Sequence, residues 1–187
     1  MSLERIASKE IILVTGAARS GKSEWAEILA TKKNKPVVYI ATAKVDPEDR
    51  EWAARIEKHR QRRPSNWQTL IAPNNLPTAI ENAPRSSCLL VDSLGTWVAN
   101  FLTLNEEDWQ EATALLLEIL TSGDRDIILV GEETGWGVVP AYASGREFRD
   151  RLGSLIRKIG TIADRVYLVT GGHALDLTVL GEPISNN

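Results

Sequence analysis

A glycine-rich segment near the start of the sequence has the residue types and the spacing of a phosphate-binding loop. Residues 16–23 read GAARSGKS, in which two glycines separated by four residues precede Lys22 and Ser23. In such a loop, backbone N–H groups cradle the phosphates, the lysine contacts the terminal phosphates and the serine hydroxyl binds Mg²⁺. An ordinary strand-to-helix turn accounts for the glycines but not for glycine, lysine and serine together. The segment therefore predicts a nucleotide site, with Lys22 as its catalytic cation, formed by Gly16, Ala17, Ala18, Arg19, Ser20, Gly21, Lys22 and Ser23.

An aspartate at the end of an apolar run is the second feature with chemical meaning. Asp92 closes the run CLLVD at residues 88–92. If this run is a strand beside the phosphate loop, the carboxylate can hold Mg²⁺ directly or through water. Aspartate after a buried strand is also a common helix cap, so a structural interpretation exists too. Together with the loop, the run predicts that Ser23 and Asp92 hold Mg²⁺.

A basic segment at residues 50–67 contains one of the two histidines of the sequence. Four of its residues, at spacings of four, three and four, would share one face of a helix: Trp52, Ile56, His59 and Arg63. One interpretation is a solvated basic helix whose histidine happens to flank an apolar stripe. The other is that its cations bind a triphosphate and keep the imidazole neutral, so that the imidazole can attack phosphorus. Spacing alone does not separate the two.

The segment GEETGWGVVPAYASGREFRD, residues 131–150, follows another apolar run. Gly135 and Gly137 flank Trp136, so the backbone there can hinge and bring the indole over a substrate. Glu133 would then act as an acid–base or hydrogen-bonding group. The alternative is a well-packed turn in which Trp136 fills the core.

The elements that must position these residues alternate between short apolar runs and longer helical patterns. The runs, rich in β-branched residues, predict parallel strands at 11–15, 37–41, 88–92, 126–131 and 165–170. Helices are expected at 22–33, 48–62, 94–103, 107–121 and 144–162. This alternation predicts a three-layer α/β fold, a mostly parallel sheet with helices on both faces. Ligands of such sheets bind at the carboxyl ends of the strands, where the phosphate loop lies.

Length and composition fit one domain of 187 residues, of which 43% are hydrophobic and 25% charged. We expect this domain to span residues 1–187, with frayed ends at 1–9 and 181–187. The stretch 72–87 is expected to be a surface excursion that contains a short helix.

Charge and cysteine content restrict the function further. A net charge of −3 argues against a general nucleic-acid binder. The single cysteine, Cys88, is expected to be an inert core residue, and His173 a structural or incidental one. No apolar run is long enough to span a membrane and the first residues lack the apolar region of a signal peptide, so we expect a cytoplasmic protein.

In their order and spacing, these features resemble the bifunctional adenosylcobinamide kinase / adenosylcobinamide-phosphate guanylyltransferase family. The similarity covers most of the chain and rests on LVTGAARSGKS, VVYIATA, RIEKHRQRRPSNW, LLVDSLGTWVANFL, EETGWGVVPAYASGREFRDRLG and ADRVYLVTGG. The second and third of these segments distinguish this family from other phosphate-loop proteins.

The resemblance implies two reactions in cobalamin assembly. A nucleoside triphosphate, ATP or GTP, phosphorylates the aminopropanol hydroxyl of adenosylcobinamide. GTP then guanylylates that phosphate through a GMP–histidine intermediate, releasing pyrophosphate and giving adenosylcobinamide-GDP. The resemblance also implies a recombinase-like phosphate-loop fold, assembly as a homotrimer, and His59 as the nucleophile. The remaining nucleotide contacts that it implies are Ala41, Thr42, Ala43, Arg60, Gln61, Arg62, Arg63 and Asp92.

Three positions depart from the pattern of this family. Ile71 stands where the pattern has a glutamate that contacts nucleotide, and Glu132 replaces an asparagine before Glu133. Ile156 and Arg157 stand near a position where members usually carry a polar pair. Two other functions stay open: a simple small-molecule kinase, against which the basic segment argues, and a nucleotide-binding regulatory protein without turnover.

Overall fold

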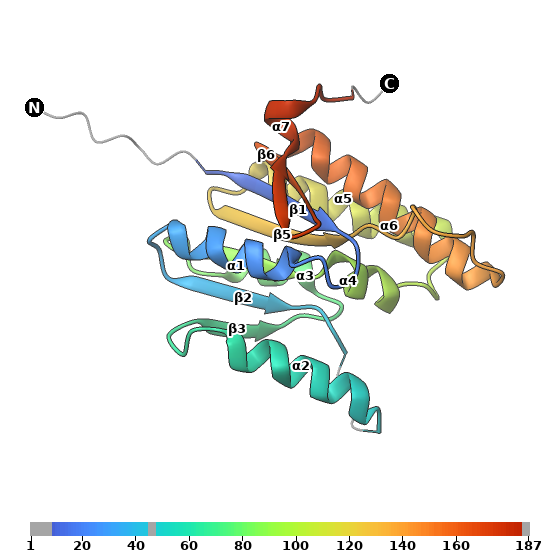
Figure 1. Cartoon of the computed structure of the whole chain (residues 1–187), viewed down its shortest axis with the longest axis horizontal. Helices are drawn as coiled ribbons and strands as arrows, with labels where there is room; N and C mark the ends of the chain where they lie inside the picture. Colours follow the sequence, from blue (N-terminus) through green and yellow to red (C-terminus); the bar gives the residue numbers. More distant parts are fainter. Residues whose placement is uncertain (1–8, 45–47, 185–187) are drawn as a thin grey trace, which may run out of the picture.

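The computed structural model describes residues 9–44 and 48–184 (Figure 1). Within these residues, seven strands form one sheet in the order β3-β2-β4-β5-β1-β6-β7. Their bounds are β1 Ile11–Gly16, β2 Val37–Ala41, β3 Gln68–Ile71, β4 Cys88–Asp92, β5 Asp126–Glu132, β6 Arg165–Thr170 and β7 His173–Asp176. Every neighbouring pair is parallel except β6 and β7, which are antiparallel. The predicted mostly parallel sheet is confirmed.

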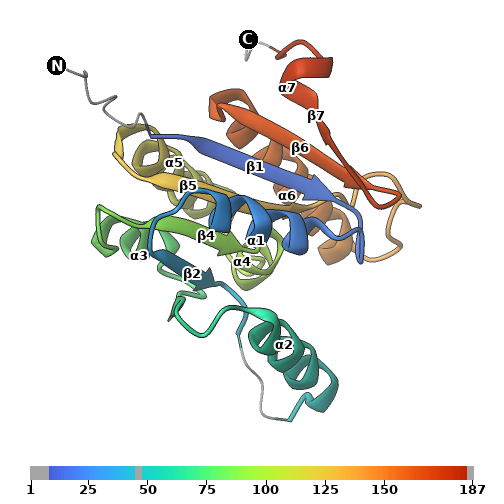
Figure 2. The ribbon, with the colours of Figure 1, turned by 60° about the vertical axis from the view of Figure 1, so that its left-hand side comes forward.

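The helices lie on both faces of this sheet, as predicted. Their bounds are α1 Lys22–Lys32, α2 Arg50–Arg62, α3 Leu76–Asn82, α4 Leu94–Asn100, α5 Glu106–Ser122, α6 Ala143–Ile162 and α7 Leu177–Leu180. Helix α1 covers one face, and α3, α4, α5 and α6 cover the other (Figures 1 and 2). Helix α2 lies beside β3, the strand at one edge of the sheet (Figure 1). Among the described residues, no helix has the length and apolar character needed to cross a membrane.

The central strands are apolar throughout because both of their faces are covered. Along β1, Leu13 packs in the cluster with α3 to α6, while Ile12 and Val14 pack in the cluster with α1. Full burial of one such side chain contributes about 1.5–3 kcal/mol. In the larger cluster, Trp97 is 0% exposed and its ring meets that of Trp109, with centroids 5.6 Å apart.

Charged side chains form ion pairs and hydrogen bonds at the amino ends of the strands, opposite the phosphate loop. Asp126 begins β5 and is buried. Its carboxylate forms ion pairs with Lys35 at 2.8 Å and Lys33 at 3.2 Å, and accepts the N–H of Glu10 at 2.9 Å. These contacts join the starts of β1 and β5 to the segment that follows α1.

The structure differs from the sequence predictions at the edges of the sheet and in the stretch 72–87. The edge strands β3 and β7 are short and carry polar side chains, so they lack the continuous apolar pattern that predicts the other strands. The expectation of a surface excursion at 72–87 is wrong for its apolar residues, because Leu76 and Ile80 of α3 are buried in the core. The predicted frayed ends lie mostly outside the described residues.

Candidate functional site

The phosphate loop connects β1 to α1 with backbone shapes that require glycine. Gly21, the N-cap of α1, has a φ of 93°, in the left-handed region that glycine adopts without strain. A Cβ at Gly16 would lie 2.5 Å from the carbonyl oxygen of Val169 and 2.6 Å from Oγ of Ser20. The two glycines of the motif are therefore needed to shape the loop, as the sequence predicts.

The polar groups of this loop turn inward. Lys22 is only 8% exposed, and its ammonium group donates to the carbonyl oxygen of Ala17 at 3.3 Å. The hydroxyl of Ser20 is buried and has no hydrogen-bond partner among the described residues. Buried polar groups normally have a partner. The loop thus presents a cation and a hydroxyl that a phosphate group can satisfy.

Asp92 lies at the carboxyl end of β4, where its Oδ2 accepts a hydrogen bond from the hydroxyl of Tyr39 at 3.0 Å. Burial and the charge of Asp92 raise the pKa of Tyr39, so this hydroxyl stays protonated and donates. Asp92 and Ser23 offer a carboxylate and a hydroxyl, which are hard oxygen ligands that suit Mg²⁺. Residues 9–44 and 48–184 contain no group of three or more His, Cys, Asp or Glu side chains able to hold a metal ion. Mg²⁺ at nucleotide sites takes most of its ligands from phosphate and water.

A half-buried carboxylate, which the sequence does not predict, lies between these two features. Glu132 ends β5 in register with Gly16 of β1, and its Oε2 accepts the N–H of Gly95 at 2.9 Å. Burial raises the pKa of Glu132, against a hydrogen bond with Ser93 and the charge of Lys22. A Cβ at Gly95 would lie 2.8 Å from Cδ of Glu132, so a side chain at that position would displace the carboxylate. The departure at Glu132 is thus accommodated by specific partners.

The loop after β5 is fixed at its start and exposed beyond it. The N–H of Glu133 donates to the carbonyl oxygen of Gly16 at 3.0 Å, and Arg149 donates to that of Gly135 at 2.8 Å. Trp136 is 67% exposed. The interpretation of Trp136 as a core residue is therefore wrong. Three more large apolar side chains of this segment are also exposed: Val138, Val139 and Tyr142.

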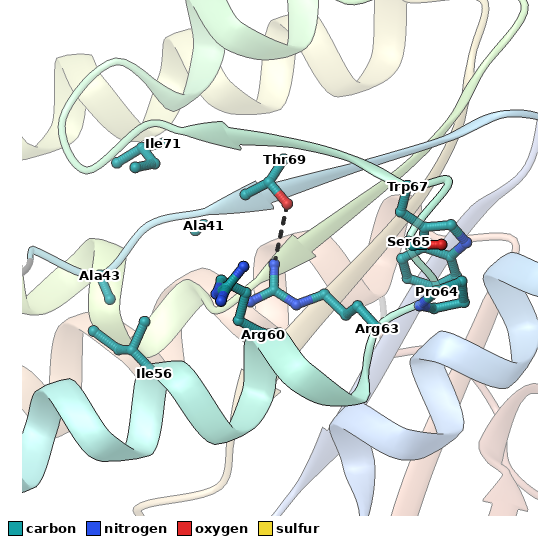
Figure 3. Close-up of a pocket in the computed structure, with 10 residues that line it drawn as sticks. All are labelled: Ala41, Ala43, Ile56, Arg60, Arg63, Pro64, Ser65, Trp67, Thr69 and Ile71. Carbon is teal, nitrogen blue, oxygen red and sulfur yellow. Dashed lines mark hydrogen bonds between the residues drawn. The ribbon is translucent and has the colours of Figure 1, made fainter.

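A hollow of about 340 Å³ lies between α2 and the strands β2 and β3 (Figure 3). Its lining consists of Ala41, Ala43, Ile56, Arg60, Arg63, Pro64, Ser65, Trp67, Thr69 and Ile71. The guanidinium of Arg63 lies over the ring of Tyr39, 3.7 Å from its centroid, and donates to Thr69 Oγ1 at 3.3 Å. Apolar walls with two arginines suit a flat base that carries a phosphate. The predicted contacts Ala41, Ala43, Arg60 and Arg63 meet here.

Two arginines of the basic segment, Arg60 and Arg62, have carboxylate partners in this structure. Arg60 pairs with Glu57 at 2.7 Å, and Gln61 donates to the same carboxylate at 2.9 Å. Arg62 pairs with Glu27 at 2.9 Å and also with Glu24, so it joins α2 to α1.

The remaining predicted residues are placed as follows. Helix α2 includes His59, but the side chains of Trp52, Arg55 and His59 lie outside what the structure describes. Thr42 is buried, and its hydroxyl donates to the carbonyl oxygen of Ser93 at 2.6 Å, so it joins the ends of β2 and β4 rather than lining the hollow. His173 is exposed on β7.

Cys88 is buried in the core, as predicted. Burial raises the pKa of its thiol to about 12, so the thiol stays protonated and unreactive near neutral pH.

Comparisons with known proteins agree with these features. The family model described as cobinamide kinase / cobinamide phosphate guanyltransferase matches residues 12–177. The bifunctional adenosylcobalamin biosynthesis protein CobP of Pseudomonas aeruginosa is 40% identical over 174 residues, covering 92% of this chain and 98% of that protein. The corresponding protein CobU of Escherichia coli is 34% identical over 177 residues, covering 87% and 96%. A solved structure from Pyrococcus horikoshii OT3, 8% identical, covers 95% of this chain and 93% of its own with a TM-score of 0.54, a likeness of fold alone.

Proposed function

The chain belongs to the cobinamide kinase / cobinamide phosphate guanyltransferase family, and on this basis we propose that it catalyses both reactions in that name. In the first, a nucleoside triphosphate phosphorylates adenosylcobinamide. In the second, GMP passes from GTP to the new phosphate. The observation that carries the proposal is the presence of two binding features at one edge of the sheet, a phosphate loop and a hollow lined by arginines.

For the kinase step, the backbone N–H groups of residues 16–23 hold the triphosphate, and Lys22 stabilises charge on the transferred group. Ser23 and Asp92 would hold Mg²⁺, which when bound neutralises phosphate charge. The hydroxyl oxygen of adenosylcobinamide forms a bond to the γ-phosphorus as the bond to the bridging oxygen breaks. Glu133, at the start of the exposed loop, orients that hydroxyl, and Trp136 packs against the corrinoid.

For GMP transfer, a ring nitrogen of His59 attacks the α-phosphorus of GTP and pyrophosphate leaves. A phosphate oxygen of adenosylcobinamide phosphate then attacks the phosphorus of the GMP–histidine and regenerates the free imidazole. The position of His59 in the sequence supports this role, because it comes three residues after Ile56 and four before Arg63, and these two residues line the hollow together with Arg60. These arginines would bind the α-phosphate and the product phosphate. The resemblance also supports a homotrimer that acts on small molecules and not on nucleic acid.

The test is covalent labelling by GTP that carries the label on its α-phosphate. Wild-type protein with Mg²⁺ should accumulate label that is lost in acid and kept in base, as expected of a phosphorus–nitrogen bond to histidine. His59→Asn should abolish the label and retain kinase activity, while His173→Asn serves as the matched control and labels normally. Label on His59→Asn would show that another residue is the nucleophile. Phosphorylation without label on the wild type would indicate a simple kinase, and nucleotide binding without any product a regulatory protein.

A further inference from the structure

One buried side chain contacts residues of both candidate sites. Tyr39 lies in the middle of β2 and is only 4% exposed. On one side its hydroxyl donates to Asp92 at 3.0 Å, and on the other its ring lies under the guanidinium of Arg63, 3.7 Å from the ring centroid. Asp92 belongs to the phosphate-loop site, and Arg63 lines the hollow (Figure 3). The two sites therefore share a side chain.

Each contact orients the group that it reaches. A carboxylate rotates about its last torsion unless a donor fixes it, and the Tyr39 hydroxyl is such a donor for Oδ2 of Asp92. Groups that hydrogen-bond to metal ligands in this way tune metal affinity, and their loss typically costs about 10–100-fold. Arg63 is held by the ring and by Thr69, so its guanidinium keeps one plane at the wall of the hollow.

The sequence around Tyr39 has no other need for a hydroxyl. The same face of β2 packs in the apolar cluster with α1, where phenylalanine would fill the space equally well. A buried hydroxyl is costly unless it is hydrogen-bonded. The contact with Asp92 gives this hydroxyl a partner, so the choice of tyrosine over phenylalanine points to Asp92.

We propose that Tyr39 is a positioning residue for both sites: its hydroxyl fixes the carboxylate of Asp92 toward Mg²⁺, and its ring fixes Arg63 toward the phosphate of the nucleotide in the hollow. The proposal rests on the proposed function, because it takes the phosphate loop and the hollow as nucleotide sites. It adds a residue that touches neither substrate and yet sets the geometry of both sites.

The hydroxyl is tested by calorimetric binding of GDP at a series of Mg²⁺ concentrations. Tyr39→Phe keeps the ring, so its affinity for GDP without metal should stay within about twofold of that of wild type. Mg²⁺ should raise the affinity for GDP, and the Mg²⁺ concentration that gives half of this increase should be about 10–100-fold higher in Tyr39→Phe than in wild type. Tyr167→Phe is the matched control. Tyr167 is buried in the same cluster, but its hydroxyl accepts from Arg165 at 3.1 Å, and its loss should leave the Mg²⁺ dependence unchanged.

Two results of this titration overturn the role of the hydroxyl. One is a Mg²⁺ dependence of Tyr39→Phe equal to that of wild type. The other is a shift in Mg²⁺ dependence that Tyr39→Phe causes equally in an Asp92→Ala background. A residue that acts through Asp92 should cause no shift once Asp92 is removed. If instead the wild type binds GDP with no dependence on Mg²⁺, the proposed phosphate-loop function has failed, and that failure is visible before any variant is made.

The ring is tested by metal-free binding of GMP, whose single phosphate directs it to the hollow rather than to a loop built for the distal phosphates. Tyr39→Leu removes the platform under Arg63 and should weaken GMP binding about 2–30-fold, the range expected for a cation–π contact. Tyr39→Phe should bind GMP as wild type does. Equal GMP affinity of Tyr39→Leu and Tyr39→Phe, in variants that melt within a few degrees of wild type, overturns the role of the ring. If Tyr39→Leu does not fold, Tyr39→Met, which also lacks the ring and is closer to it in volume, supplies the same comparison, and GMP affinity equal to that of Tyr39→Phe overturns the role.

Discussion

Replacement of Trp136 by alanine tests whether the loop after β5 serves the substrate or the fold. Trp136 is 67% exposed, so the substitution removes little buried area. Exposed substitutions of this kind change the free energy of unfolding by about 0.5 kcal/mol, and we allow up to about 1 kcal/mol for the buried third of the side chain. In a chain of this length, 1 kcal/mol moves the melting temperature by about 2–4 °C. The melting temperature of Trp136→Ala should therefore fall by at most about 4 °C.

Trp97→Ala supplies the scale for a tryptophan that does support the fold. Trp97 is 0% exposed and contacts the rings of Phe101 and Trp109. Truncation of such a side chain costs about 3–5 kcal/mol, or about 6–20 °C in melting temperature. The two variants remove the same atoms, so the difference between them measures burial.

The substrate role of Trp136 predicts a kinetic effect without a thermal one. Stacking of an indole on a flat partner contributes about 0.5–1.5 kcal/mol beyond the area buried. The KM for adenosylcobinamide in the kinase assay should therefore rise at least about 2–10-fold in Trp136→Ala, with the KM for the nucleotide unchanged. A fall in melting temperature as large as that of Trp97→Ala, or unchanged use of adenosylcobinamide, would refute the reasoning.

Three further predictions follow from the site and from the ion pairs. Lys22→Ala should lower kinase turnover by about 10²–10³ in a protein that still folds, since the charge of Lys22 stabilises the transferred phosphate; near-normal turnover would remove the phosphate-loop assignment. Gly95→Ala should displace the carboxylate of Glu132 and cost about 1–3 kcal/mol in denaturant unfolding, but almost nothing in a Glu132→Ala background; an equal cost in both backgrounds would contradict the contact. Burial alone would raise the pKa of Asp126, but Lys35 and Lys33 outweigh it and hold that pKa below its ordinary value. Ionised Asp126 therefore stabilises the fold above about pH 4, and this stabilisation is lost as the pH falls through its lowered pKa. The difference in unfolding free energy between wild type and Asp126→Asn should be constant from pH 5 to 7 and shrink below pH 4, and a difference that persists at low pH would disprove the ion pairs.

The strands and the phosphate loop could be predicted because their signals are local. Each central strand is a short apolar run, and residues 16–23 carry the whole pattern of the loop. The edge strands β3 and β7 were not predicted, because strands at an edge bury less of their side-chain surface and carry polar residues. A strand at an edge is defined by its neighbour more than by its own sequence.

The contacts that shape the site could not be predicted, because they join residues far apart in the sequence. In the sequence Glu132 is only a departure from a family pattern, and its contact with Gly95 follows from the pairing of β5 with β1 and β4. Tyr39 reads as an ordinary strand residue. Tyr39 and Ala41 are two residues apart in β2 and so lie on the same face of the sheet, and Ala41 pairs with Asp92. This spacing is the one feature of the sequence that could have placed Tyr39 beside that carboxylate.

The pairing of Arg62 with Glu24 and Glu27 has a consequence for how the protein responds to its solvent. The side chains of Arg62 and Glu24 are 33% and 53% exposed, so dissolved ions reach them. At physiological ionic strength, charges in water are screened over about 8 Å, and an exposed pair such as Arg62 with Glu24 contributes only about 0–1 kcal/mol. Glu27 is 14% exposed, so its pair with Arg62 is screened less. The core beneath the phosphate loop is apolar and insensitive to such screening. Higher ionic strength should therefore weaken the attachment of α2 to α1 more than it weakens the apolar core of the sheet. Rates measured in dilute and in concentrated buffers then refer to proteins in which α2 is held more tightly and less tightly, respectively.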